Sequence, residues 1–460
     1  MANKGAHALV LGAGVAGLLT ARVLSEFYGS VTMVERDVLP DRPEHRKGVP
    51  QGLHLHNFLS RGTQLIGELF PGILEELAAA GAAVDDGDDL SRLYVRVAGY
   101  ELNPPGKLAD PVPLAAYQAS RPFVEFHLRR RVAALANVTI LDNHKVIEPR
   151  VTAGTVTGAR IINHVNGIES TVDADLVIDT TGRASRTRAF LESYGFGPVP
   201  QDMTPPTWGY SSHLMHIPSG RIGERMAFVS QGSSAPGAVL MAYEHDTWML
   251  AISCPVGLGP PPKTFIEMLE MADRILPPAI STVLHDATPI GEIAISRATA
   301  TQWQRYDRMS QLPTGLLVLG DALCTLNPLY GQGMTMAAMH AFTLRDCLQA
   351  GDTDMARFYS AAVEHIAPVW AMNQANELPA APNPSLQARM RSWMQRAALA
   401  AATTNIAVAE RLLRVRGLID PPTRLQDPAL LVQILLTNLR HPRIKPLDHL
   451  TTGLSVQPSV

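Results

Sequence analysis

Three glycines near the start of the chain have the spacing of a loop that binds a dinucleotide. Gly12, Gly14 and Gly17 follow a short apolar run over 8–11 and open a segment with one apolar helical face. The first glycine permits a tight turn, the second lets the backbone approach a pyrophosphate, and the third lets helix and strand pack closely. Glu35, 18 residues beyond Gly17, can accept hydrogen bonds from both ribose hydroxyls and would repel a 2′-phosphate. The pattern predicts FAD or NAD rather than NADP.

Two later segments also bring glycine to the end of a buried strand. The strand over 174–179 runs into Thr181-Gly182, and the strand over 315–320 runs into Asp321. A second glycine group, 328–334, then opens a long helix that we expect to continue to Leu348. Asp321 can hydrogen-bond a ribityl hydroxyl, and the N–H groups at this helix start can stabilise negative charge on the flavin N1/C2 edge.

A polar loop over 41–62 carries Arg46, Lys47 and Gly48, followed by His54 and His56. We interpret it as a cofactor-proximal loop whose basic groups line the flavin. The two histidines also suggest a metal site, but no carboxylate or cysteine lies nearby at ligand spacing. A solvated loop before a helix is the third interpretation.

Arg121 stands at the start of a predicted helix, where Ser120 is a plausible N-cap. There it can meet a phosphate or the ribityl chain, or it can be an ordinary surface arginine. The triplet Arg129–Arg131 is interpreted as a solvated face.

The elements that must position these residues indicate an α/β fold. The strand–glycine segments predict one parallel, Rossmann-like sheet of the glutathione-reductase type. A β-rich stretch over 138–172 precedes the return to this sheet, which is typical of flavin-binding folds. Strands over 208–254 and near Ile293, with a helix at Phe265–Ile275, predict a second, β-sheet domain.

The C-terminal residues have helical patterns over 355–370, 386–419 and 428–439. We expect these helices to cap the flavin domain; alternatively, Leu430–Leu436 dips into a membrane interface. The expected domains are an FAD-binding domain (1–70, 118–190 and 300–350), a substrate-binding β-sheet domain (71–117 and 191–299) and a helical C-terminal region (351–460).

Bulk composition argues against several classes of protein. The 460 residues carry 39 basic and 42 acidic side chains, a net charge of −3, which gives no case for nucleic-acid binding. Cys254, Cys324 and Cys347 are far apart, so neither a disulfide framework nor a zinc site is indicated. No apolar run approaches the roughly 20 residues that span a bilayer, and no leader pattern precedes the first strand. We expect a reduced, cytoplasmic protein without a metal.

Three motifs together make the chain recognisable: GAGVAG with Glu35, DTTG over 179–182, and GDA followed after five residues by PLYGQGMT. Over roughly residues 5–350 this combination resembles the FAD-dependent monooxygenases of the aromatic-hydroxylase superfamily. The spacing is also similar to that of squalene-epoxidase-like and polyether-epoxidase-like members. The residues and the resemblance together predict these FAD contacts: Gly12, Gly14, Ala16, Gly17, Glu35, Arg36, Arg46, Lys47, Gly48, Arg121, Thr181, Gly182, Asp321, Pro328, Gly331, Gln332, Gly333 and Met334.

The resemblance implies insertion of one oxygen atom from O2 through a flavin C4a-hydroperoxide, in a pocket that excludes water. Epoxidation then needs no catalytic side chain, and none is singled out. Met215, Phe228, Met241 and Trp248 would give the second domain an apolar pocket, although such residues are often plain core. We therefore expect epoxidation of an alkene in a lipophilic polyketide or terpenoid. The alternatives are aromatic-ring hydroxylation, prenyl-chain reduction, halogenation (no W-x-W-x-I-P signature is found) and a non-enzymatic lipophilic carrier.

One position departs from the aromatic-hydroxylase pattern. Those enzymes carry an Asp-Gly pair linked to NADPH use, where this chain has Thr181-Gly182. NAD(P)H is therefore expected to reduce the flavin either directly or through a separate flavin reductase. The expected partners are a lipophilic small molecule, O2 and such a reductase, without nucleic acid and without an integral membrane span.

Overall fold

The computed structural model describes residues 4–232, 235–296, 300–351, 355–377, 385–441 and 446. At its centre lies a five-stranded sheet with the order β19-β11-β1-β2-β7, in which all neighbouring strands are parallel. Its strands are β1 (Gly5–Leu11), β2 (Tyr28–Val34), β7 (Val138–Leu141), β11 (Leu176–Asp179) and β19 (Leu316–Val318). Because the strands are parallel, their carboxyl ends meet at one edge of the sheet.

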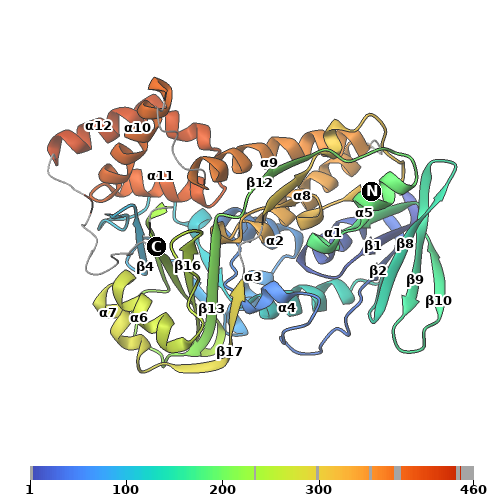
Figure 1. Cartoon of the computed structure of the whole chain (residues 1–460), viewed down its shortest axis with the longest axis horizontal. Helices are drawn as coiled ribbons and strands as arrows, with labels where there is room; N and C mark the ends of the chain where they lie inside the picture. The colour runs from blue at the N-terminus through green and yellow to red at the C-terminus, as the bar shows by residue number, and fades with distance from the viewer. Residues whose placement is uncertain are drawn as a thin grey trace, which may run out of the picture.

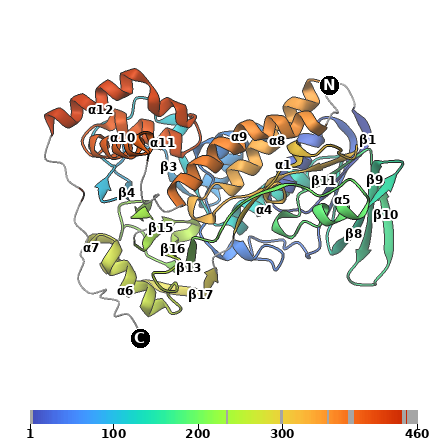
Figure 2. The ribbon, with the colours of Figure 1, turned by 45° about the horizontal axis from the view of Figure 1, so that its top comes forward.

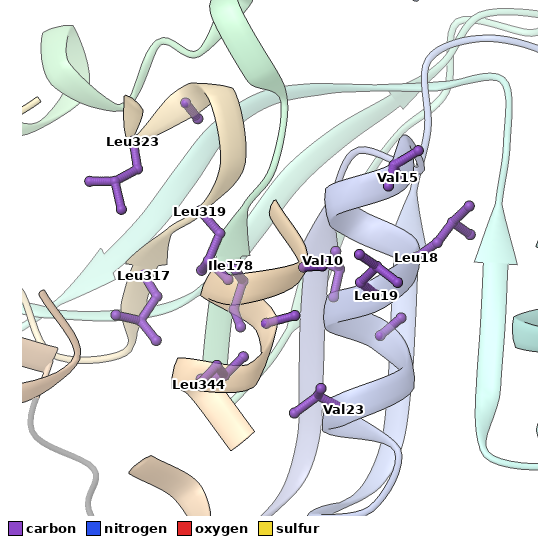
Figure 3. Packing of buried hydrophobic residues seen from close by; sticks show 14 of the residues in the cluster. Val10, Val15, Leu18, Leu19, Val23, Ile178, Leu317, Leu319, Leu323 and Leu344 are labelled. Carbon is purple, nitrogen blue, oxygen red and sulfur yellow. The ribbon is translucent and has the colours of Figure 1, made fainter. Parts of the chain in front are cut away.

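Two helices that lie far apart in the sequence pack side by side over this sheet. Figure 3 shows Leu18 and Val23 of α1 (Val15–Leu24) and Leu344 of α8 (Gly333–Gln349) in the same buried cluster as Val10 of β1. A fully buried leucine contributes about 1.5–3 kcal/mol. The other helices of this half are α2 (Ser60–Leu69), α3 (Ile73–Ala79), α4 (Arg121–Ala133), α5 (Thr187–Ser193) and α9 (Met355–Glu377).

An antiparallel three-stranded meander follows β7, in agreement with the β-rich pattern expected over 138–172. It comprises β8 (His144–Thr152), β9 (Thr155–Asn163) and β10 (Glu169–Asp173). Figure 1 shows it at the end of the molecule near the N-terminus, from which the chain returns through β11. Smaller sheets are formed by β3 (Ala83–Asp85) with β6 (Ala116–Gln118), and by β12 (Gln201–Thr204) with β18 (Thr301–Gln304) and β20 (Cys324–Thr325).

The second large sheet has seven strands in the order β17-β13-β16-β15-β14-β4-β5. Its strands are β4 (Leu93–Val97), β5 (Tyr100–Glu101), β13 (Trp208–His216), β14 (Met226–Ser230), β15 (Gly237–Ala242), β16 (Thr247–Pro255) and β17 (Thr288–Ser296). One face packs against α6 (Phe265–Ile275) and α7 (Pro278–Leu284), whose Met268 and Leu284 are fully buried. The predicted helix over 265–275 is confirmed.

Three C-terminal helices, α10 (Leu386–Ala402), α11 (Ile406–Arg416) and α12 (Pro428–Arg440), gather at the opposite end of the molecule (Figures 1 and 2). The single helix predicted over 386–419 is wrong, because Asn405 caps a new helix by accepting from the N–H of Ala407. These helices bury Leu399 and Val408 against Val95 and Phe228 of the seven-stranded sheet, whereas α9 packs in the core of the parallel-sheet half. Parts of the predicted helical region, 352–354, 378–384 and nearly all of 442–460, lie outside the described residues.

Candidate functional site

A cavity of about 880 Å³ lies at the carboxyl edge of the parallel sheet. Four strand ends reach it, at Gly12 after β1, Glu35 after β2, Thr180 after β11 and Asp321 after β19. Sixteen of the eighteen predicted FAD contacts line this cavity, and Gly17 and Lys47 do not. Residues from distant parts of the chain therefore converge on one space.

The loop after β1 leaves the start of α1 open toward the cavity. Gly12 has a φ of +100°, which L side chains rarely adopt. A Cβ on Gly17 would lie 2.0 Å from the carbonyl oxygen of Gly12. Gly17 therefore allows α1 to pack closely against the loop after β1 and does not line the cavity. No side chain among the described residues caps α1 at Gly14. Its first N–H groups can therefore bind an anion.

Two guanidinium groups lie beside this helix start. A Cβ on Gly14 would be 3.8 Å from Nη2 of Arg121 and 3.9 Å from Nη2 of Arg46. Arg46 is buried, and its Nη1 lies 3.1 Å from Oε2 of Glu35 while its Nη2 lies 2.8 Å from Oε1 of Glu125. Burial alone would lower the pKa of Arg46, but the carboxylates of Glu125 and Glu35 outweigh it and raise that pKa. Arg46 therefore stays charged beside the cavity.

Arg121 is the first residue of α4, whose N-cap is Ser120 as predicted. Its Nη1 donates to Nε2 of His56 at 3.4 Å. Its buried Nε, 3.5 Å from Oε2 of Glu125, makes no hydrogen bond within the described structure. This guanidinium therefore has donor capacity left for a phosphate.

The start of α8 is the second open helix end at the cavity. Gly331 adopts a φ of +66°, and α8 begins at Gly333 without a side-chain cap from any described residue. Gly320 has a φ of +63°, and a Cβ there would lie 2.8 Å from that of Ala16, so this glycine lets the two loops meet. The N–H of Gly320 donates to Nδ1 of buried His340, whose pKa is lowered by burial to about 3.

The loop after β11 is organised by a buried carboxylate. Asp179 accepts hydrogen bonds from the N–H and hydroxyl of Thr181 at 2.8 and 2.6 Å, and from the hydroxyls of Ser185 and Thr187. The Thr181 hydroxyl, at the position where the sequence departs from the aromatic-hydroxylase pattern, is thus used within the protein.

These features fit FAD. Two helix starts without side-chain caps among the described residues face one cavity, and Gly14 leaves room that a Cβ would fill. Arg46 and Arg121 supply positive charge beside that room, which suits a pyrophosphate. Contact of each individual lining residue with FAD remains a prediction.

The opposite wall of the cavity is one face of the seven-stranded sheet, and it carries both hydroxyl-bearing and apolar side chains. Tyr210 and Ser212 of β13, Ser253 of β16 and Ser296 of β17 line the cavity. Strand register pairs Tyr210 with both Ser253 and Ser296, so these hydroxyl-bearing residues form one patch. Val239, Ala251 and Ile295 lie among them.

His54 stands between the two walls and is the residue that sequence reasoning missed as a catalytic candidate. Its Nδ1 lies 3.1 Å from Oγ of Ser212, and its ring meets Tyr210 edge-on with a centroid distance of 4.7 Å. Burial lowers the pKa of His54 to about 4, so the imidazole is neutral at neutral pH and has a ring nitrogen that can accept a hydrogen bond. The sequence marked His54 only through its spacing to His56.

His56 has a structural role beside it. Its Nδ1 hydrogen-bonds the carbonyl oxygen of His54 at 3.0 Å, and Tyr243 of the sheet bonds both its backbone N–H and its carbonyl oxygen. Burial and the charge of Arg121 lower the pKa of His56 to about 3. In the part of the chain that the structure describes, no three His, Cys, Asp or Glu side chains are placed to hold a metal.

The four predicted substrate-pocket residues lie elsewhere, and that prediction is corrected. Met215 and Trp248 are register partners on the sheet face covered by α6 and α7. Phe228 packs against the C-terminal helices, and Met241 packs with Tyr243 and Met249. All four are buried core residues that do not line the cavity, because strand alternation places Met215 and Trp248 on the face opposite to Tyr210.

The two walls are joined at the tip of the β15–β16 hairpin. Glu244 accepts hydrogen bonds from the backbone N–H and the hydroxyl of Ser120, at 2.7 and 2.5 Å. His245 and Asp246 complete the turn with positive φ values of 55° and 57°. The sheet is thereby fixed to the residue that precedes Arg121.

Comparison with known proteins supports this geometry. The profile of a family described as "FAD binding domain" matches residues 6–357. Protein Rv3254 of Mycobacterium tuberculosis is 35% identical over 456 residues, which is 95% of each chain. Kynurenine 3-monooxygenase of Salinispora arenicola is 24% identical over 376 residues, covering 76% of this chain and 74% of that enzyme.

Among solved structures, a flavoprotein/dehydrogenase from Cytophaga hutchinsonii has a similar fold, with a TM-score of 0.66 at 15% identity; the match covers 95% of this chain and 99% of that one. The family match spans well over half of the chain and contains the strand ends, glycines and arginines described above. The chain therefore belongs to the FAD-binding-domain family of aromatic-hydroxylase-type flavin monooxygenases, and it is an FAD-dependent monooxygenase.

Proposed function

We propose that this monooxygenase hydroxylates an aromatic ring that carries a hydroxyl or amino substituent. The observation that carries the proposal is a cluster of hydrogen-bonding side chains on the cavity wall, where Tyr210, Ser212 and His54 lie together. A site built to hydrogen-bond a polar substituent discriminates strongly against substrates that lack it. A purely lipophilic alkene would make no use of these hydrogen-bonding groups, which in the protein bond one another, His54 with Ser212 and Tyr210 with Ser296.

Each wall has its own task in this proposal. Arg46, Arg121 and the two helix starts hold FAD, which when bound would activate O2, the source of the oxygen atom that is transferred. Neutral His54 accepts a hydrogen bond from the substituent and, where that substituent is a hydroxyl, takes up its proton as the ring reacts, which makes the ring more electron-rich; an amino group enriches the ring without losing a proton. The hydroxyls of Tyr210 and Ser212 orient that substituent, and apolar neighbours such as Val239, Ala251 and Ile295 pack on the ring and exclude water.

Epoxidation of an alkene in a lipophilic polyketide or terpenoid is the second candidate. Leu55, Val239, Ala251 and Ile295 give the cavity enough apolar surface to hold an alkene. This reaction would need no base, so it gives His54 no chemical role.

The test uses FAD-loaded protein, NADPH, an added flavin reductase and 18O-labelled O2. Substituted phenols and anilines are compared with prenyl alkenes, and label in the product is measured by mass spectrometry. We expect label in a hydroxylated phenol or aniline, at a rate that His54→Gln lowers. Label found only in epoxides, at a rate unchanged by His54→Gln, would overturn aromatic hydroxylation in favour of epoxidation.

We also propose that reduction of the flavin depends on a separate reductase. The proposal is supported by Thr181, whose hydroxyl is bound to Asp179 where aromatic hydroxylases carry an acid linked to NADPH use. We expect NADPH alone to bleach the flavin of the pure protein slowly, with or without substrate. Rapid bleaching that a substrate accelerates would refute this.

A further inference from the structure

Helix α12 has apolar residues on two faces, only one of which is buried. Leu430 and Ile434 pack inward against the other C-terminal helices. On the outer face, large apolar side chains recur with helical spacing i, i+3, i+4 and i+7. These are Val432, Leu435, Leu436 and Leu439, with exposed fractions of 55%, 44%, 48% and 76%. A contiguous exposed stripe of this kind marks an interaction surface.

Helix α10 carries a second such stripe, in Leu386, Met390 and Trp393, which are 79%, 61% and 48% exposed. The two helices pack on each other, and Nδ2 of Asn438 in α12 donates to the carbonyl oxygen of Ala397 in α10. Figures 1 and 2 both show them at the end of the molecule away from the parallel sheet. We name these seven apolar residues, together with the arginines below, the α10–α12 surface.

The charged residues of both helices have one sign. Arg389, Arg391 and Arg396 lie exposed on α10, and Arg440 ends α12. Neither helix sequence contains an aspartate or a glutamate. Apolar side chains whose only charged neighbours on the same helices are arginines complement a surface that is apolar inside and anionic outside.

Charge also argues against two other partners for the α10–α12 surface, a second copy of this chain and the chain's own C-terminal residues. A second copy of this chain would bring the same arginines against those already present. The sequence over 442–460 carries Arg443 and Lys445 against a single acid, Asp448, so it does not complement the arginines either.

We propose that the α10–α12 surface binds membranes that contain anionic lipids, with the leucines, Met390 and Trp393 among the acyl chains and the arginines at the headgroup phosphates. The binding is in the plane of the interface. No helix of the described residues is long and apolar enough to cross a bilayer.

Flotation of the full-length, FAD-loaded protein with lipid vesicles tests this. We expect binding to vesicles of phosphatidylcholine with phosphatidylglycerol, much less binding to phosphatidylcholine alone, and weakening by salt. Leu439→Glu and Arg391→Glu should each lower the bound fraction by about tenfold. Val165→Glu is the matched control, because Val165 is 79% exposed on the distant β9–β10 turn.

Trp393 supplies a second readout, since the other four tryptophans are buried. Its fluorescence should shift to the blue with anionic vesicles, and Trp393→Phe should remove the shift. Absence of binding to anionic vesicles would overturn the proposal. So would equal loss of binding in Val165→Glu, or a concentration-dependent dimer that Leu439→Glu abolishes.

Discussion

The two walls of the cavity are built in different ways. The wall at the parallel sheet consists of glycines, open helix starts and strand-end residues, each placed by the few residues around it. The wall at the seven-stranded sheet consists of side chains from β13, β15, β16 and β17, placed by strand pairing between distant segments. The first wall fits a cofactor common to the family, and in the proposed function the second faces the substrate. Local sequence therefore encodes the cofactor side, and tertiary register encodes the substrate side.

Arg121→Met should break the cofactor wall most strongly. Removing one partner of a buried charge pair costs about 2–5 kcal/mol, so FAD affinity should fall by about 1,000-fold. Equilibrium titration with FAD measures the loss. Arg130→Met is the control, because Arg130 is exposed on the same helix. Equal FAD affinity in the two variants would contradict the phosphate role of Arg121.

Gly17→Ala tests the local packing on which the same wall depends. The new Cβ would meet the carbonyl oxygen of Gly12 at 2.0 Å, so α1 must move, with an expected stability loss of about 3 kcal/mol. Urea unfolding and flavin absorbance per protein measure the effect. Gly223→Ala, where no atom lies within 4 Å, should behave as wild type. A stable, fully yellow Gly17→Ala variant would show that the helix start tolerates displacement.

His54→Gln should impair the substrate wall alone. Loss of a general base lowers turnover by about 100-fold or more, while FAD binding stays unchanged. With a phenol as substrate, the remaining rate should rise with pH as the phenol ionises by itself, which a purely structural loss would not produce. His216→Gln, at an exposed position on β13, is the control. A pH-independent deficit would count against His54 as the base.

Acid should destabilise the cofactor wall through His340. Its pKa is about 3 in the folded protein and about 6.5 when unfolded, so the unfolded state binds the proton first as pH falls. The stabilisation is complete above pH 6.5 and is lost toward pH 3, at about 1.4 kcal/mol per pH unit. Urea unfolding between pH 7 and 5 should show a shallower slope in His340→Gln. Identical slopes would refute this assignment.

Met215→Leu should have the smallest effect of these substitutions on stability and turnover, which would show that this face of the sheet is not part of the substrate wall. Met215 lies on the sheet face under α6 and α7, so a swap of similar volume should cost less than about 1.5 kcal/mol and leave KM unchanged. Ser212→Leu, on the cavity face, should raise KM. A changed KM in Met215→Leu alone would reverse the assignment of the two faces.

The residues of the cofactor wall could be predicted from the sequence, whereas those of the substrate wall could not. The strands before Gly12, Thr181 and Asp321 are short apolar runs with glycine at their ends, so neighbouring residues determine both element and site. The contact between His54 and Ser212 joins residues 158 positions apart, and no local pattern specifies it. The alternating pattern of β16 correctly predicted that Trp248 lies on an apolar face of the sheet. It could not show that α6 and α7 cover that face.

The hydrogen bonds from Ser120 to Glu244 connect the β15–β16 hairpin of the seven-stranded sheet to the start of α4. A substrate that displaced β15 and β16 would shift Ser120 and the first turn of α4, where Arg121 lies beside the cavity. Because coupling between two binding sites is reciprocal, a substrate that changes the affinity for FAD by some factor would have its own affinity changed by the same factor when FAD is bound.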